Sequence, residues 1–102
     1  MKFLLVIQCP ATSMKDYDDL IEIESLLIEG LSATNEVDGH DIGANEVNIF
    51  IHTDNPLRAF DEVKSVLAGC ANWFNAQVAY RDISTIEYTI LWPKDLKIFK
   101  VG

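Results

Sequence analysis

Near its start the chain carries an unbroken apolar run from Phe3 to Ile7, and Pro10 follows shortly afterwards. A strand that is apolar at nearly every position has both of its faces covered, so the segment 2–9 predicts an interior strand of a sheet. The run is shorter than the apolar part of a secretory signal peptide, which spans about 7–15 residues. We also find no stretch close to the ~20 apolar residues of a membrane-spanning helix. A folded domain without leader or membrane segment is therefore expected.

Two segments have the spacing of amphipathic helices. The first is expected over 14–29, with Ser13 as N-cap in a weak capping box and Gly30 at its end. The second is expected over 56–68, because Asn55 can cap it and its leading proline suits the first helical position. The apolar face of this second helix comprises Phe60, Val63, Val66, Leu67 and Cys70.

Four further segments have the composition of strands, and they are 35–39, 46–53, 76–82 and 86–92. In the second of these, Val47, Ile49 and Ile51 alternate with residues that face the other side. Turn-forming residues occupy 39–45, so the second and third strands of the chain should form a hairpin.

Each helix supplies the crossover that two parallel strands need, which gives the order βαββαβ followed by a C-terminal strand. This order predicts an α+β fold, a ferredoxin-like sandwich with an antiparallel sheet and both helices on one face. The first and third strands, which are the most apolar, should then be central. The length of 102 residues fits one domain spanning 1–102.

The sheet face without helices should carry Phe50, together with Tyr80 or Trp92. An aromatic patch on such a face often marks a partner or a dimer interface. The alternative is that the C-terminal segment folds back and covers it, since Phe99 and Val101 are apolar.

Charge is the feature that departs most from the average. Sixteen acidic and eight basic residues give a net charge of −8, and residues 1–56 alone carry −9. No lysine or arginine occurs between Asp16 and Leu57. A free-standing nucleic-acid binder carries the opposite sign, so this class is excluded. A concentrated negative surface steers basic partners towards it, although a solvated face that maintains solubility has the same composition.

On the first helix, Asp18, Glu22 and Glu29 share one face at 3.6-residue spacing. Glu24 instead falls inside the apolar arc, where burial would raise the pKa of its carboxyl. The alternative is a rotated helix in which Glu24 reaches the edge of the interface. Ile23 and Leu26 would then be more buried, and Ile28 less.

The densest polar cluster is the segment 38–46, which holds Asp38, His40, Asp41 and Glu46. One imidazole and three carboxylates could serve as a metal site or an acid–base pair. A closed transition-metal site usually has more than one His or Cys ligand, and aspartate and glycine also serve turn geometry. We therefore favour a turn and expect no metal and no cofactor. His52 should lie about 20 Å from Glu46 along the strand, at the surface or an interface.

Cys9 and Cys70 are far apart in sequence and form no CxxC pattern. Two buried thiols in a reducing compartment are favoured over a disulfide, so the cytoplasm is the expected location.

Several segments carry a resemblance to known sequences, namely Val37-Asp38-Gly39-His40-Asp41-Ile42-Gly43, Glu46-Val47-Asn48-Ile49-Phe50-Ile51, Thr53-Asp54-Asn55-Pro56 and Leu91-Trp92-Pro93. With them the chain resembles a group of small uncharacterised bacterial proteins of about this length, with a DGHDIGxxExNIFI hairpin motif. The resemblance implies a small bacterial protein that acts on its own, and it transfers no activity. In size and charge the chain is also similar to immunity proteins of toxin systems.

These patterns predict a non-enzymatic interaction module whose acidic face contacts a basic protein, for example as an immunity-type inhibitor of a toxin. The expected contact residues are Asp18, Glu22, Glu29, Asp38, His40, Asp41, Glu46 and Phe50. The alternative is a dimeric ligand-binding protein or enzyme that uses the open sheet face, with His40 or His52 as acid or base. A purely structural assembly subunit is a third possibility. Neither nucleic acid nor membrane is expected as a partner.

Overall fold

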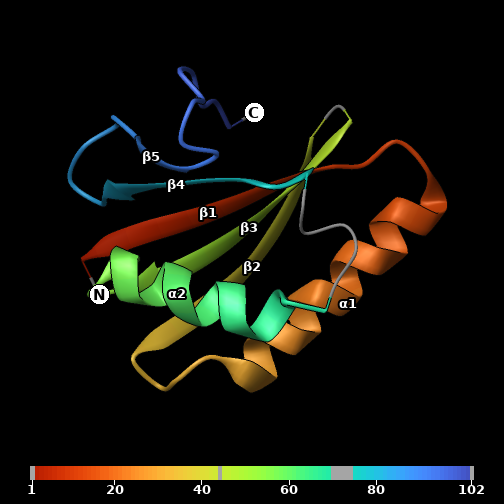
Figure 1. Ribbon diagram of the computed structural model, residues 1–102, viewed down its shortest axis with the longest axis horizontal. Coiled ribbons are helices and arrows are strands. Elements are labelled where there is room, and N and C mark those ends of the chain that lie inside the picture. Colours follow the sequence, from red (N-terminus) through yellow and green to blue (C-terminus); the bar gives the residue numbers. More distant parts are fainter. Residues whose placement is uncertain (1, 44, 70–74, 102) are drawn as a thin grey trace.

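The computed structural model describes residues 2–43, 45–69 and 75–101 (Figure 1). Its elements in chain order are β1 (Phe3–Pro10), α1 (Met14–Gly30), β2 (Asn35–Gly43), β3 (Glu46–Thr53), α2 (Pro56–Leu67), β4 (Gln77–Asp82) and β5 (Thr89–Trp92). All five strands pair antiparallel in one sheet, in the order β2-β3-β1-β4-β5. The fold is therefore α+β and compatible with a ferredoxin-like kind of fold. It differs from a simple ferredoxin-like sandwich in two details. β5 is an added edge strand, and the β2–β3 and β4–β5 pairings are irregular.

The core lies between the sheet and both helices. Leu5, Ile7 and Cys9 alternate along β1 on the side of the sheet that faces the helices, and all three are buried. Both helices contribute to the same cluster, through Leu20, Ile23, Leu27, Ala59, Phe60, Val63 and Leu67. The predicted interior position of the first strand is confirmed, because β1 pairs with β3 on one side and with β4 on the other.

The helix ends follow the local sequence. Ser13 accepts a hydrogen bond from the Asp16 amide at 3.2 Å, and Asn55 accepts one from the Arg58 amide at 3.1 Å. Gly30 has a different role from the predicted cap, because a Cβ there would lie 2.8 Å from a methyl of Val66. Its missing side chain lets α1 approach α2 closely.

The hairpin is longer and tighter than predicted. β2 extends to Gly43, which pairs with Glu46, so only positions 44 and 45 link the strands. Asn45 adopts the left-handed conformation with φ of 63° that such turns require. The sequence predicts a strand over 35–39 and turn residues over 39–45. The strand instead continues through Gly39, with an irregularity at Asp38 and Gly39, where Gly39 has φ of 107°.

The C-terminal segment covers part of the sheet face opposite the helices, as Figure 1 shows. The Gln8 side chain donates a hydrogen bond to the Lys100 carbonyl at 2.7 Å, and the rings of Tyr88 and Phe99 lie 5.1 Å apart. Val6 points to this face and is fully buried. The sequence left open whether this face is a partner interface or is covered by the C-terminal segment. Over β1 and β4 the C-terminal segment covers it.

Phe50 is half-buried on this same face. Tyr80 instead pairs with Leu5, packs against the core on the helix side and contacts Phe3 edge to face. The expectation that Tyr80 joins Phe50 is therefore wrong, because the register of β4 turns Tyr80 towards the helices. Trp92 lies in the edge strand β5, beside an irregularity in its pairing with β4, and is 41% exposed, so its place next to Phe50 stays a prediction.

Cys9 is a free thiol in the core, and burial raises its pKa to about 12. Cys70, the other cysteine, lies outside the described residues. Among the helices that are described, neither is long and apolar enough to cross a lipid bilayer.

Gly39 and Gly69 provide a matched test of the irregularity in β2. A Cβ would meet no atom within 4 Å at either position, but only Gly39 has a positive φ. We expect Gly39→Ala to lower the free energy of unfolding by about 1–2 kcal/mol through backbone strain alone. Gly69→Ala should leave it within about 0.5 kcal/mol of the wild type. Urea unfolding monitored by circular dichroism measures the free energy of unfolding of both variants. Equal midpoints would contradict a strained backbone at Gly39.

Candidate functional site

The outer face of α1 is acidic along its length. Asp18, Glu22 and Glu29 are all exposed, with Ser25 exposed between them. They point away from the sheet, because Leu20, Ile23 and Leu27 on the opposite side of the helix form part of the core. This arrangement is the one expected from their spacing.

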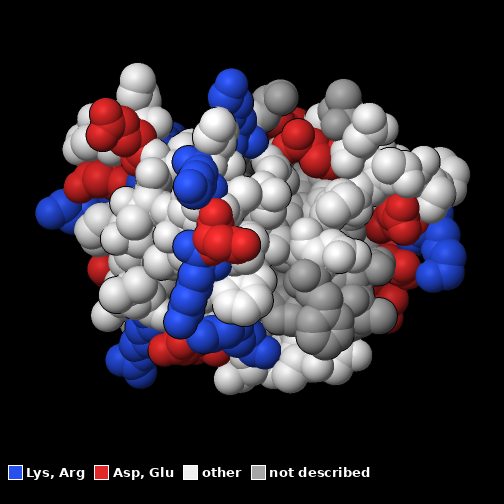
Figure 2. Space-filling view, turned by 45° about the horizontal axis from the view of Figure 1, so that its top comes forward, with Lys and Arg blue, Asp and Glu red and all other residues white. Residues whose placement is uncertain are grey.

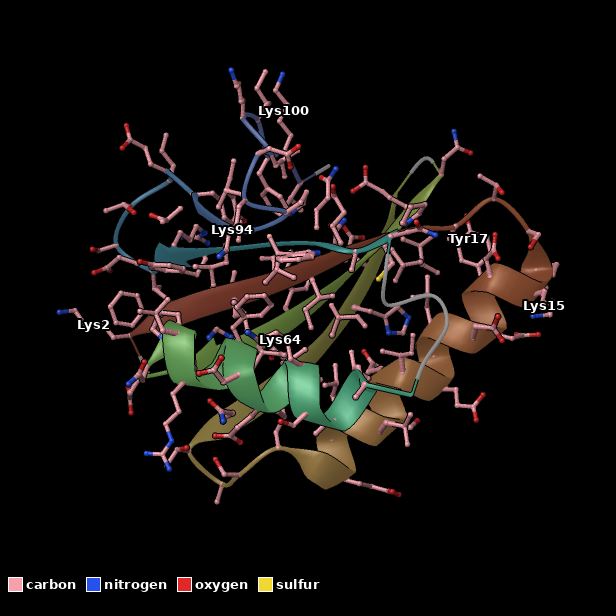
Figure 3. The ribbon with its side chains drawn as sticks, viewed as in Figure 1. Lys2, Lys15, Tyr17, Lys64, Lys94 and Lys100 are labelled. Atoms are coloured by element: carbon pink, nitrogen blue, oxygen red, sulfur yellow. The ribbon has the colours of Figure 1, made fainter. Side chains whose placement is uncertain are left out.

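Apart from Lys15, the basic residues labelled in Figure 3 lie on other elements than α1. In Figure 3 the labelled lysine on α1 is Lys15, at the start of the helix, where it pairs with Asp19 at 3.1 Å. Lys64 lies on α2, and Lys94 and Lys100 lie by the C-terminal segment. Across the described ranges, no lysine or arginine forms an ion pair with Asp18, Glu22 or Glu29. Figure 2 shows a different face, on which blue and red side chains are mixed.

Glu24 and His40 connect α1 to the edge strand β2. The Glu24 carboxylate lies 2.8 Å from His40 Nδ1, and only 14% of the Glu24 side chain is exposed. Ile23 is buried and Ile28 exposed, as the rotated helix predicts, but Leu26 is exposed and that part of the prediction is wrong. The hydrogen bond to β2 satisfies the carboxylate without the larger rotation that would bury Leu26.

Two further acidic residues of the predicted set, Asp38 and Asp41, are exposed on β2. Asp38 lies 3.2 Å from His52 Nε2 on the neighbouring strand. Since β2 is at one edge of the sheet, these carboxylates flank a strand edge that no other strand of the described chain covers. The structure thus places α1 next to β2, joined by Glu24 and His40, while Asp38 and Asp41 point to the sheet face opposite the helices.

Glu46 does not belong to this surface. Its carboxylate accepts hydrogen bonds from Gln8 at 2.7 Å and from Asn48 at 2.9 Å, on the sheet face opposite the helices. Asn48 is fully buried. The sequence groups Glu46 with the hairpin acids, but its place at the start of β3, opposite Pro10, directs its side chain towards Gln8 of β1.

This network borders a shallow recess of about 220 Å³, lined by Gln8, Pro10, Asn45, Glu46, Asn75 and Gln77. Sequence reasoning missed Gln8 and Asn48. The available signal was their polarity inside otherwise apolar strands, because buried amides need partners. The Gln8 amide already has three acceptors, in Glu46, Asn48 and the Lys100 carbonyl, so the recess wall is internally satisfied.

A second recess of about 150 Å³ lies near the start of α2, lined by Thr34, Asn35, Thr53, Asp54, Asn55, Arg58 and Glu62. Glu62 accepts a hydrogen bond from the Ser32 amide at 2.8 Å and another from the Asn35 side chain at 3.3 Å. The bond from the Ser32 amide is the main cause that lowers the pKa of Glu62. These bonds hold the loop after α1 against α2.

Of the two histidines in the alternative ligand or catalytic site, His40 lies apart from Phe50. His40 pairs with Ile49, whose side chain faces the helices, whereas Phe50 pairs with Val6 on the other face. His52 lies on the Phe50 side and is bonded to Asp38. Within the part of the chain that the structure describes, no group of three His, Cys, Asp or Glu side chains is placed to hold a metal ion.

No protein-family model matches the chain, and no significant match is found among curated proteins or solved structures.

The two histidine–carboxylate pairs, Glu24 with His40 and Asp38 with His52, differ in how exposed the carboxylate is, so their coupling energies can be compared. We expect a double-mutant cycle with Glu24→Gln and His40→Asn to give a coupling energy of about 1 kcal/mol, because this pair is shielded. The same cycle with Asp38→Asn and His52→Asn should give less than about 0.5 kcal/mol, since 59% of the Asp38 side chain is exposed. Chemical denaturation of all variants measures both values. A larger coupling for the Asp38 pair would contradict the role given to Glu24.

Glu62 provides a pH-dependent test. The pKa of Glu62 is lowered in the fold, so its contribution to stability is present above its ordinary pKa of 4.5 and is lost as the pH falls. Glu62→Gln should therefore lower the free energy of unfolding by about 1 kcal/mol at neutral pH. The difference from wild type should vanish towards pH ~3. Thermal unfolding measured across this range checks the sign, and a difference that grows on acidification would contradict it.

Proposed function

We propose that this protein is a non-enzymatic interaction module that binds a basic protein through α1 and the edge strand β2. The observation that carries this proposal is the exposed row Asp18, Glu22 and Glu29, without a basic partner among the described residues. A charge distribution of this kind raises association rates with partners of opposite sign.

An immunity-type inhibitor of a toxin is one concrete form of this function. The active surface of a nuclease binds phosphates through Lys and Arg side chains. A row of carboxylates competes for those same side chains, so a partner of this class would be inhibited by occupation of its substrate surface. We also infer a ferredoxin-like sandwich as the scaffold and the cytoplasm as the location. The strand order and the buried thiol of Cys9 support these two inferences.

Two triple variants with the same net charge test the proposal. Asp18→Lys, Glu22→Lys and Glu29→Lys reverse the row on α1, whereas Asp61→Lys, Glu87→Lys and Asp95→Lys reverse exposed acids on α2, the β4–β5 loop and the C-terminal segment. The wild-type protein is used to capture binding proteins from the native host, and these are identified. The rates at which the wild type and both variants associate with the purified basic partner are then measured at low and high salt. We expect the first variant to associate at least about tenfold more slowly, and the second to match wild type.

The wild-type rate should also fall steeply with salt, because the carboxylates are exposed. Capture of no basic protein, or equal slowing by both variants, would overturn the proposal. Equal slowing would mean that overall charge, and not the position of the acidic row, governs association.

A further inference from the structure

A row of exposed apolar side chains runs along α1 beside the acidic row. Met14, Ile21 and Ile28 are 77%, 48% and 61% exposed, although each is large and hydrophobic. They are seven residues apart, and every seventh residue of a straight helix drifts by only about 20°. The three side chains therefore form one stripe, about 21 Å long at 1.5 Å per residue.

The stripe lies on the side of α1 that faces the strand edge. Glu24 is three residues after Ile21 and four before Ile28, so it neighbours both on the helix surface. Its bond to His40 fixes this side of the helix towards β2. Ile42 of β2 is 55% exposed and pairs with the core residue Val47, so it also points to the helix side of the sheet.

Acidic residues border this apolar surface along its outer flank. Asp18 neighbours Met14 and Ile21 on the flank away from the sheet, and Glu22 and Glu29 continue that flank. On the other side lies Glu24, whose carboxylate is bonded to His40, whereas Asp38 and Asp41 of β2 point to the opposite face of the sheet. A partner that covers the stripe must therefore be apolar along one face and basic along the margin that meets the outer flank.

We infer that the stripe is the docking site for a basic amphipathic helix of a partner protein. This inference rests on the proposed function and names the chemistry of its partner. A seven-residue repeat is the spacing with which one helix packs along another. A partner helix of about four turns covers the stripe, and lysine or arginine along one of its margins meets the acidic flank of Asp18, Glu22 and Glu29.

An added strand fits less well at this surface. The irregularity at Asp38 and Gly39 interrupts the edge of β2, and irregularities and charges on an edge strand oppose strand addition. A second copy of this chain is disfavoured by charge. In a two-fold contact between antiparallel helices each flank meets its own copy, so Asp18, Glu22 and Glu29 would face the same three carboxylates. Parallel helices would set them against Glu24 of the other copy.

Two labelled synthetic peptides of identical composition test the inference by fluorescence anisotropy. One is about 15 residues of leucine and lysine with leucine on one helical face, and the other is shuffled so that no apolar face forms. Both should bind through charge. The peptide with the apolar face should bind at least about tenfold more tightly, because only it can bury the stripe.

Two double variants assign the difference to the stripe. Ile21→Ser with Ile28→Ser should remove the tenfold preference and leave the binding of the shuffled peptide unchanged. Leu57→Ser with Ile86→Ser changes apolar residues on α2 and in the β4–β5 loop that are 59% and 90% exposed, and should retain the preference. All four positions are already exposed, so the core is intact in both variants.

The possible failures are distinguishable. Equal affinity for the two peptides, or a preference that survives Ile21→Ser with Ile28→Ser, overturns the docked helix but leaves the acidic interaction surface. Binding of neither peptide counts against the proposed function as well. Sedimentation of the wild type as a dimer that Ile21→Ser with Ile28→Ser dissociates would show that a second copy occupies the stripe, which overturns the inference.

Discussion

Leu5 and Val6 are consecutive residues of β1, so they point to opposite sides of the sheet, yet both are fully buried. An apolar strand of this kind needs a cover on each side. The two helices provide one cover, and the C-terminal segment, held by the bond from Gln8 to Lys100, provides part of the other. The pairing of β1 with β3 and β4 then fixes which strands are interior.

This requirement limits where the proposed interaction surface can lie. The core uses both helices and the interior strands, and the C-terminal segment occupies the opposite face beside β1 and β4. The surfaces left uncovered include the outer side of α1 and the free edge at β2, where the exposed stripe of Met14, Ile21 and Ile28 and the acidic row beside it are found. The strand irregularity at Gly39 and the carboxylates along β2 also protect this edge against uncontrolled strand pairing.

Charge and apolar area have different parts in the proposed interaction. Exposed carboxylates attract a basic partner over a distance of about a Debye length and set the rate of encounter. The apolar stripe contributes only after contact, because burial of its side chains requires a complementary face. A partner that is basic but lacks such a face would associate rapidly and dissociate rapidly.

The sequence determined the order of the elements, both helix N-caps and the acidic row on α1, because these depend on local spacing and on residue type. It could not decide the roles of Asp38 and Gly39, since the same two residues suit a turn and an irregular strand. The sequence also did not reveal the bond between Glu24 and His40, or that Glu46 bonds to Gln8 on the other face of the sheet. Those contacts depend on strand register and on how α1 lies over β2, and only long-range packing sets these two.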